Sequence, residues 1–171
     1  MNCEKGVTLI ELLIVLAVLG ITLVFAVPHF AQVLAEMEAK KVESNLRTLL
    51  SHGKQQAYIH RQRIAVCGSD DGTTCNKTGW SKGVIVFKDT QVANRNRDSE
   101  EKIIQQISFN LKYGTLNWQG ALDQNPAFQP DSGLPRGANG KFKYCSTHYK
   151  KHFNLIMSDM GHLRLEKQNT C

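Results

Sequence analysis

The chain has 171 residues, 42% hydrophobic and 21% charged, so it is long enough for one domain with a core and too apolar for wholesale disorder. Its 21 Lys and Arg residues outnumber its 15 Asp and Glu residues, which gives a net charge of +6. That balance favours acidic partners such as nucleic acid or anionic lipid without requiring either. The apolar residues are concentrated at the amino terminus, which excludes an ordinary cytosolic protein.

Residues 7–27 form a continuous apolar stretch in which Glu11 is the one ionisable side chain. A helix of this length spans roughly 31 Å, close to the hydrocarbon thickness of a bilayer. The stretch exceeds the apolar core of a secretory signal peptide, and no small-x-small cleavage site follows it. A simple signal anchor fits these facts but leaves Glu11 unexplained, because a lone carboxylate in hydrocarbon costs about 2.5–3.5 kcal/mol.

The first residues, Met1-Asn-Cys-Glu-Lys-Gly6 followed by Val7-Thr-Leu-Ile-Glu11-Leu-Leu, resemble the class III leader of type IV pilins and type II secretion pseudopilins. The resemblance implies cleavage after Gly6 by a prepilin peptidase and methylation of the new terminal amine on Val7, where the family usually has phenylalanine. It also implies that Glu11 pairs with the terminal amine of a neighbouring subunit. Such an ion pair would offset the cost of burying the carboxylate.

A helical pattern continues beyond the apolar stretch. Apolar residues recur at three- and four-residue steps: Phe30, Val33, Leu34, Met37, Val42, Leu46, Leu49, Leu50 and Ala57. Opposite them, we expect a mostly solvated face: Glu36, Glu38, Lys40, Lys41, Glu43 and Arg47. The pattern predicts one long helix over 7–60, kinked near Pro28, with 7–28 in lipid or a filament core and 29–60 packed on a globular domain.

After Arg61 the period changes to that of short strands. The expected strands are 63–67, 83–88, 102–109, 142–146, 153–157 and 162–166. Turn-forming stretches separate them, and residues 119–140, with three prolines, predict a long loop. The fold class is therefore α+β, a long amino-terminal helix packed on an antiparallel β domain over 61–171.

The β region resembles the GspH/FimT (FimU-like) family of minor pilins. The resemblance rests on four stretches: Cys67-Gly-Ser-Asp-Asp-Gly-Thr-Thr-Cys75, Trp80-Ser-Lys-Gly83-Val-Ile-Val-Phe87, Gly140-Lys-Phe-Lys-Tyr-Cys145 and Ile156-Met-Ser-Asp-Met-Gly161-His-Leu-Arg164. It implies a type IV pilin-like fold and a single pass through the bacterial inner membrane, with a periplasmic β domain. Other pilins or pseudopilins in a filament are then the expected partners.

The cysteines predict disulfides. Cys3 belongs to the leader, and the four others lie beyond the membrane segment, on the oxidising side. Cys67 and Cys75 flank a turn-rich segment, which leaves Cys145 and Cys171 for each other. Loops of about 9 and 27 residues would stabilise the fold by roughly 2.6 and 3.5 kcal/mol. A zinc site is disfavoured because no C-x-x-C pair and no His at ligand spacing are present.

No pattern of an enzyme is found. The sequence has no HExxH, GxSxG, P-loop or Rossmann glycine pattern, and Ser69-Asp70-Asp71-Gly72 lacks the alternating ligands and terminal glutamate of a calcium loop. We therefore expect no catalytic residues, no metal and no cofactor.

The carboxyl-terminal third is basic. Residues 131–171 carry seven Lys and Arg residues against three Asp and Glu residues. Tyr144, Tyr149 and Phe153 lie among the lysines, as stacking residues do on surfaces that bind single-stranded nucleic acid. Charge alone favours the simpler interpretation, a solvated basic face with its aromatic residues in the core.

Some FimT-like pilins bind DNA through a glycine-arginine-x-arginine motif, and the matching stretch here is Gly161-His162-Leu163-Arg164. His162 stands where the family has the first arginine and is largely neutral at pH 7. DNA binding therefore stays a hypothesis, with these candidate residues: Lys141, Lys143, Lys150, Lys151, His162, Arg164 and Lys167.

Three hypotheses follow for the function. The first is a structural and assembly protein, a minor pilin at the tip of a type IV pilus. The second is a pilin whose basic face captures DNA for uptake, which is compatible with the first. The alternative is a GspH-like minor pseudopilin of a type II secretion system, and the sequence favours the pilus only through its basic surface.

Overall fold

The computed structural model describes residues 8–91, 95–121, 124–147 and 149–171, without the side chains of 25, 26 and 28. The chain divides into two compact units, Met1–Leu34 and Ala35–Cys171. Helix α1, Leu9–His60, runs through both and ends where Arg61 adopts a left-handed φ of 51°. The expected long helix is confirmed, whereas the kink near Pro28 stays a prediction.

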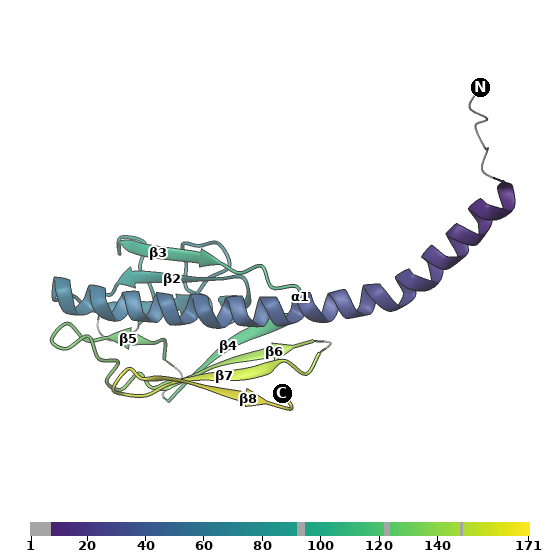
Figure 1. Ribbon diagram of the computed structural model, residues 1–171. Helices are drawn as coiled ribbons and strands as arrows, with labels where there is room; N and C mark the ends of the chain where they lie inside the picture. Colours follow the sequence, from purple (N-terminus) through teal and green to yellow (C-terminus); the bar gives the residue numbers. More distant parts are fainter. Residues whose placement is uncertain (1–7, 92–94, 122–123, 148) are drawn as a thin grey trace, which may run out of the picture. The chain divides into compact units, whose positions relative to one another are not determined.

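The second unit holds two four-stranded antiparallel sheets (Figure 1). Sheet A has the order β3-β2-β1-β5, with β1 Ile64–Gly68, β2 Gly83–Lys88, β3 Ile103–Ser108 and β5 Ala127–Phe128. Sheet B has the order β4-β6-β7-β8, with β4 Gly114–Gly120, β6 Gly140–Ser146, β7 His152–Met157 and β8 Leu163–Gln168. A short 3-10 helix, η1 Gly79–Ser81, precedes β2.

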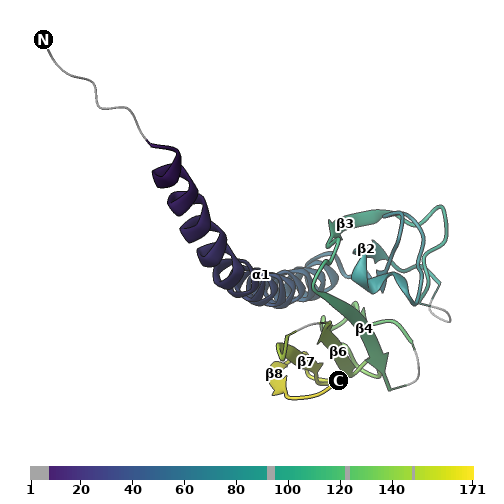
Figure 2. The ribbon, with the colours of Figure 1, turned by 90° about the vertical axis from the view of Figure 1, so that its right-hand side faces the viewer.

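The main core lies between the second half of α1 and the inner faces of both sheets, which form two separate layers beside the helix (Figure 2). Val42, Leu46 and Leu49 of α1 are at most 1% exposed and pack with Val66, Val84, Leu116 and Leu155 of the strands. Trp80 of η1 meets Phe142 of β6 edge to face, with ring centroids 5.4 Å apart. This contact joins η1, which leads into β2 of sheet A, to β6 of sheet B.

Sheet A has a second core on its outer face. Ala65, Cys67, Ile85 and Phe87 cluster there with Ala127, because strand residues point alternately to the two faces. Residues 95–101 of the β2–β3 connection fold back toward the Cys67–Cys75 loop, where the Arg97 Nη1 donates to the Thr73 carbonyl at 2.8 Å. Strands buried on both faces explain the continuous apolar runs of β1 and β2.

Two strands differ from the sequence-based expectation. The pattern did not predict β4 or the short β5, and the loop predicted over 119–140 contains the end of β4 and all of β5. β4 does alternate, since Gly114 and Leu116 are buried while Thr115 and Asn117 are exposed. One of its inward positions is a glycine, which contributes no apolar side chain. The alternation of apolar and polar residues in the sequence is therefore weak, although the burial alternates.

The predicted apolar stripe of the helix is wrong at three positions. Phe30, Val33 and Met37 are 64%, 43% and 60% exposed, whereas the buried positions at that level of the helix are Ala35 and Ala39. Small side chains allow the strands to approach the helix closely, and alanine contributes little to an apolar pattern.

Candidate functional site

The first unit presents an exposed apolar helix. From Leu9 to Val24 its large apolar side chains are between 52% and 77% exposed. Within the described residues, α1 is the one helix long and apolar enough to cross a membrane, and none of its most apolar stretch is buried in the protein. Such a surface requires lipid or other helices around it.

Glu11 lies in the first turn of this helix and is exposed. Its backbone N–H donates to the Thr8 side-chain hydroxyl at 3.3 Å, so Thr8 caps the helix and the carboxylate takes no part in the cap. The carboxylate is therefore available to a partner. Gly6 and Val7 lie outside the described residues, so cleavage and methylation stay predictions.

Both expected disulfides are present. Cys67 is bonded to Cys75, and Cys145 to Cys171. The second bond joins the outer face of β6 to the end of the chain, and the Lys143 Nζ also donates to the Cys171 carbonyl at 3.0 Å. The carboxyl-terminal tail is thereby held against sheet B.

The candidate DNA-binding residues are divided between surfaces. Lys141, Lys143 and Arg164 share the outer face of sheet B, because Lys141 pairs with Ile156 and Ile156 with Arg164 across the strands. Arg164 lies 2.6 Å from the Glu166 carboxylate, and Lys143 holds the tail. This face therefore combines three cations, two of which already have partners.

The other candidates lie elsewhere. Lys150 and Lys151 precede β7, and Lys167 pairs with Phe153 on the side of β8 that faces the helix. His162 lies beside the β7–β8 turn, at the opposite end of these strands. The sequence-based set is therefore not one continuous surface.

Two of the expected stacking residues are unavailable to nucleic acid. Tyr144 is completely buried and Phe153 is 6% exposed, and their rings stack on each other with centroids 5.1 Å apart. Both residues lie on the face of sheet B that packs into the main core, Tyr144 on β6 and Phe153 on β7. The simpler interpretation of these two aromatic residues, core packing, is confirmed.

Glu38 is the residue whose environment the helical pattern misplaced. It was expected on a solvated face, yet its carboxylate accepts hydrogen bonds from Lys112 N at 2.7 Å, Tyr113 N at 3.1 Å and the Tyr144 hydroxyl at 2.9 Å. Burial, with the Glu38 carboxylate beside it, raises the pKa of the Tyr144 hydroxyl. The glutamate thus fixes the β3–β4 turn to the helix.

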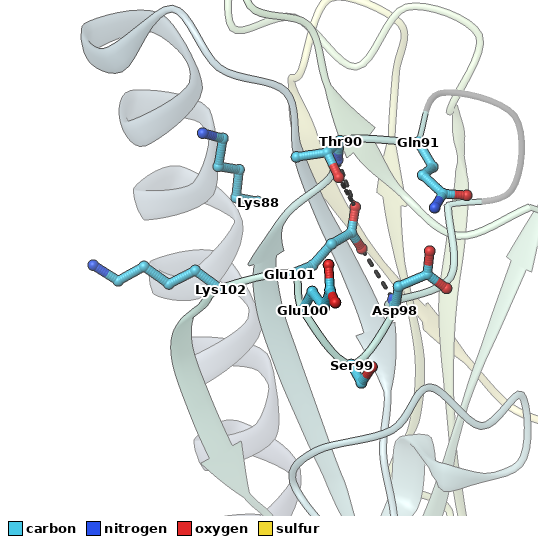
Figure 3. Close-up of a pocket in the computed structure, with 8 residues that line it drawn as sticks. All are labelled: Lys88, Thr90, Gln91, Asp98, Ser99, Glu100, Glu101 and Lys102. Atoms are coloured by element: carbon cyan, nitrogen blue, oxygen red, sulfur yellow. Dashed lines mark hydrogen bonds between the residues drawn. The ribbon is translucent and has the colours of Figure 1, made fainter.

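A hollow of about 660 Å³ lies at the β2–β3 connection (Figure 3). Glu101 is the buried carboxylate there, and it accepts hydrogen bonds from Thr90 N at 2.5 Å, Thr90 Oγ1 at 2.8 Å and Asp98 N at 3.1 Å. Burial raises the pKa of Glu101, but the hydrogen bonds from Thr90 outweigh it and hold the value below its usual range. The Glu101 carboxylate therefore holds the two ends of the β2–β3 connection together.

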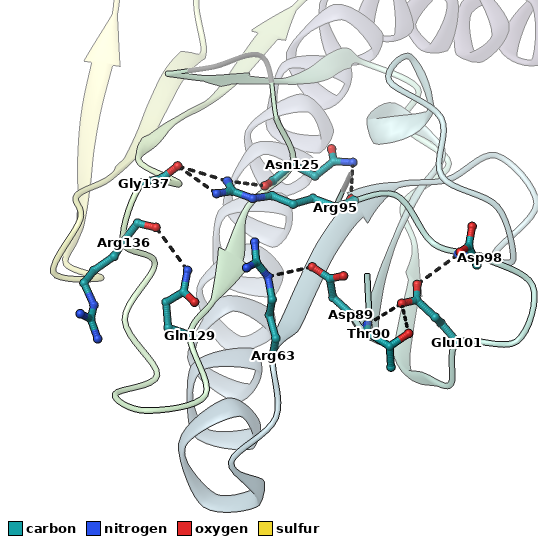
Figure 4. A network of polar contacts seen from close by, with 10 residues as sticks. All are labelled: Arg63, Asp89, Thr90, Arg95, Asp98, Glu101, Asn125, Gln129, Arg136 and Gly137. Atoms are coloured by element: carbon teal, nitrogen blue, oxygen red, sulfur yellow. Dashed lines mark hydrogen bonds and ion pairs between the residues drawn. The ribbon is translucent and has the colours of Figure 1, made fainter. Parts of the chain in front are cut away.

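Three arginines order the surrounding connections, and Figure 4 shows two of them, Arg63 and Arg95. Arg63 Nε lies 2.9 Å from Asp89 Oδ2 in a pair whose side chains are 10% and 0% exposed. Arg95 donates to the Asn125 carbonyl at 3.3 Å and the Gly137 carbonyl at 3.2 Å, and burial lowers its pKa. Arg97 is the third, already described. Sequence patterns do not identify such residues, because any surface arginine has the same local sequence character.

No metal centre is formed among the residues that the structure describes: no group of three or more His, Cys, Asp or Glu side chains is placed to hold an ion. Asp71, in the stretch compared with a calcium loop, accepts hydrogen bonds from Thr73 N and Thr74 N, each at 2.7 Å. The Thr74 and Thr73 amides lower the pKa of this carboxyl, which supports its role in the turn.

The chain belongs to the family described as type II transport protein GspH, which it matches over residues 44–161. Residues 1–27 match the prokaryotic N-terminal methylation motif. These matches identify the chain as a minor pilin or pseudopilin of the GspH/FimU type. The family and its fold are those of structural pilins.

Solved structures agree with this assignment. The type IV minor pilin FimU of Pseudomonas aeruginosa aligns with a TM-score of 0.56 at 16% identity, over 75% of this chain and 88% of that one. The minor pseudopilin EpsH of the type 2 secretion system of Vibrio cholerae aligns with a TM-score of 0.52 at 13% identity, over 76% and 97%. At these identities the likeness establishes the fold. A comparison with curated proteins gave no significant match.

Proposed function

We propose that this chain is a minor pilin of a type IV pilus that acts in assembly at the filament tip. In this proposal a prepilin peptidase removes residues 1–6, and 7–28 anchor the subunit in the inner membrane with the β domain on the periplasmic side. The same segment then enters the filament core, where Glu11 pairs with the methylated amine of a neighbouring Val7. Other pilins are the direct partners.

The observation that carries the proposal is the exposed apolar helix with one carboxylate near its start. Every large apolar side chain from Leu9 to Val24 is at least half exposed, so the protein itself provides no environment for them. Helices of other subunits would bury these side chains, and an amine would neutralise Glu11. The match of residues 1–27 to the methylation motif supports such an amine.

Replacing Glu11 tests the assembly step. We expect Glu11→Ala to be cleaved as the wild type is, which mass spectrometry of the amino terminus would show, but to be strongly depleted from sheared filaments. Glu100→Ala, which removes an exposed carboxylate of the β2–β3 connection, is the control and should be incorporated normally. Normal incorporation of Glu11→Ala would contradict the proposal.

A pseudopilin of a type II secretion system is the alternative, because the likeness includes proteins of both systems. Deleting the gene separates them. Loss of twitching motility with normal enzyme secretion would support the pilus, and the reverse result would support the secretion system.

DNA binding is a second candidate function, supported by Lys141, Lys143 and Arg164 on one face of sheet B. Phosphate contacts of this kind give an affinity that falls as salt rises. A fragment from His29 onward should bind short duplex DNA at low salt, and the triple alanine variant of these residues should not. Lys88→Ala with Lys102→Ala is the control. Equal binding by the triple variant, or no binding by the wild type, would exclude this face.

A further inference from the structure

A groove of about 240 Å³ lies between α1 and the edge of sheet B formed by β8. Ala39 of the helix, Phe153 of β7 and Leu165 of β8 provide its apolar part. Its charged residues come from three segments that are distant in sequence: Glu36, Lys40, Glu43, Lys150, Lys151 and Lys167. Neither the helical pattern nor the strand pattern indicates such a cluster.

The groove has an excess of positive charge. Four lysines against two glutamates leave a net charge of +2. Both glutamates already have cationic partners: Glu36 lies 3.0 Å from Lys40 Nζ and 2.9 Å from Lys151 Nζ, and Glu43 lies 2.9 Å from Arg47. Among the described residues, Lys150 and Lys167 form no ion pair. Their charges are therefore available to an external anion.

The covalent chain keeps this groove near the end of the apolar stretch. Glu36 lies nine residues after Val27, and α1 is helical throughout, so the rise between them is about 14 Å. Even a fully extended connection would be limited to about 32 Å. The lysines that contact or neighbour Glu36 are therefore tethered close to any bilayer that residues 7–28 span.

We propose that the groove binds the phosphate headgroup of an anionic phospholipid in the same bilayer that anchors the subunit. This proposal rests on the membrane segment of the proposed function. Lys150 and Lys167 contact the phosphate, and the apolar part of the groove accepts the glycerol and ester portion. The contact holds the β domain against the membrane surface until the subunit enters a filament.

Anionic lipid suits this groove better than nucleic acid does. A polyphosphate chain runs across an extended surface, whereas Lys150 and Lys167 lie in one small groove between the helix and β8. A single phosphate group matches the charges of these two lysines. The bilayer also presents its headgroups at high local concentration, so even a weak contact is populated.

Lysine reactivity measures the contact in the full-length chain. The protein is placed in nanodiscs of phosphatidylcholine alone or with about one third phosphatidylglycerol, acetylated briefly, and analysed by mass spectrometry. We expect acetylation of Lys150 and Lys167 to fall by about threefold or more in the anionic discs and to recover at high salt, since lipid electrostatics are screened. Lys88 and Lys102, on β2 and beside β3, are internal controls and should not change.

A pair of matched variants tests whether the two lysines cause the effect. Lys151 lies in the same groove, so the anionic discs should protect it as well, and this protection should disappear in Lys150→Gln with Lys167→Gln. In Lys88→Gln with Lys102→Gln, which removes the same charge elsewhere, it should remain. Protection that persists in the first variant would overturn the proposal.

Three further results would also overturn it. Equal acetylation in both kinds of disc would show that the groove does not meet the lipid. Protection of Lys150 and Lys167 by duplex DNA, without protection by anionic discs, would assign the groove to nucleic acid. A chain that does not enter discs at all would contradict the membrane segment itself, which separates that failure from the failure of the groove.

Discussion

Glu38 is a single side chain that connects three parts of the second unit. It belongs to α1, accepts from two backbone amides at the β3–β4 turn, and accepts from the Tyr144 hydroxyl of β6. Hydrogen bonds to a charged acceptor contribute more than neutral ones, and the Tyr144 hydroxyl is buried away from water.

We therefore predict that Glu38→Gln lowers the free energy of unfolding by about 1–3 kcal/mol. An amide presents one acceptor oxygen in place of two and adds an N–H group that has no acceptor there. Urea unfolding of the fragment from His29 measures this, since every hydrophobic residue found buried in the described part of the chain lies in the second unit. Glu43→Gln, which removes only a helix ion pair with Arg47, should cost about 0.5 kcal/mol or less. Equal effects would contradict this role of Glu38.

Glu36 gives a prediction on pH. Hydrogen bonds from Lys151 and Lys40 hold its pKa at about 2, against an ordinary value of 4.5. Because the folded-state pKa is the lower one, the contacts stabilise the fold above about pH 4.5 and are lost as the pH falls toward 2.

An NMR titration of the Glu36 carboxyl in the same fragment should thus give a midpoint near 2, and Lys151→Gln should move it upward toward the ordinary value. Lys143→Gln, on the outer face of sheet B, is the control and should leave the midpoint in place. A wild-type midpoint near 4.5 would show that the contact with Lys151 is not formed in solution.

At the scale of elements, β8 is an edge strand that depends on the end of the chain. It pairs with β7 on one side, and the Cys145–Cys171 bond fastens the residues that follow it. An edge strand without such a constraint frays and exposes unpaired backbone groups.

Replacing both Cys145 and Cys171 by serine is expected to lower the free energy of unfolding by about 2–4 kcal/mol. Amide hydrogen exchange in 163–171 should rise as well, because the tail loses its covalent anchor. The Cys67–Cys75 bond closes a shorter loop. Replacing these two cysteines by serine should therefore lower the free energy of unfolding by less and leave hydrogen exchange in β8 unchanged. Unchanged exchange in 163–171 after the first change would disagree with this account.

For the whole molecule, the connections decide how the two sheets are held together. Arg95 belongs to the β2–β3 connection of sheet A, and its guanidinium donates to the carbonyls of Asn125, just before β5 of sheet A, and of Gly137, just before β6 of sheet B (Figure 4). Arg95 itself is only 8% exposed, so its guanidinium is held inside the protein, and its removal would leave both carbonyls without this donor.

Arg95→Met should accordingly lower the free energy of unfolding by about 1.5–3 kcal/mol, because methionine keeps most of the volume and removes the donors. Arg136→Met is the control: this arginine pairs with Asp131 on the surface, and such pairs contribute little. Denaturant unfolding of both variants provides the comparison. A loss in Arg136→Met as large as that in Arg95→Met would contradict the role given to Arg95.

The sequence by itself determined the features that depend on local order along the chain. The apolar run with Glu11 predicted the exposed helix, because a continuous stretch without polar residues needs no partner to be recognised. Most strands followed from period and turn residues, and the cysteine count led to both disulfides. Each of these signals lies within one segment.

Only the tertiary structure decided which side chains of each segment lie in the core, which are bonded to another segment and which lie on a surface. It showed that Tyr144 and Phe153 belong to the core, that Glu38 is bonded to a turn more than 70 residues away, and that the basic residues are divided between a sheet face and a groove. The physical reason is that burial and pairing depend on strands that are distant in sequence. A charged or aromatic residue has the same local pattern whether it meets water, lipid or another strand.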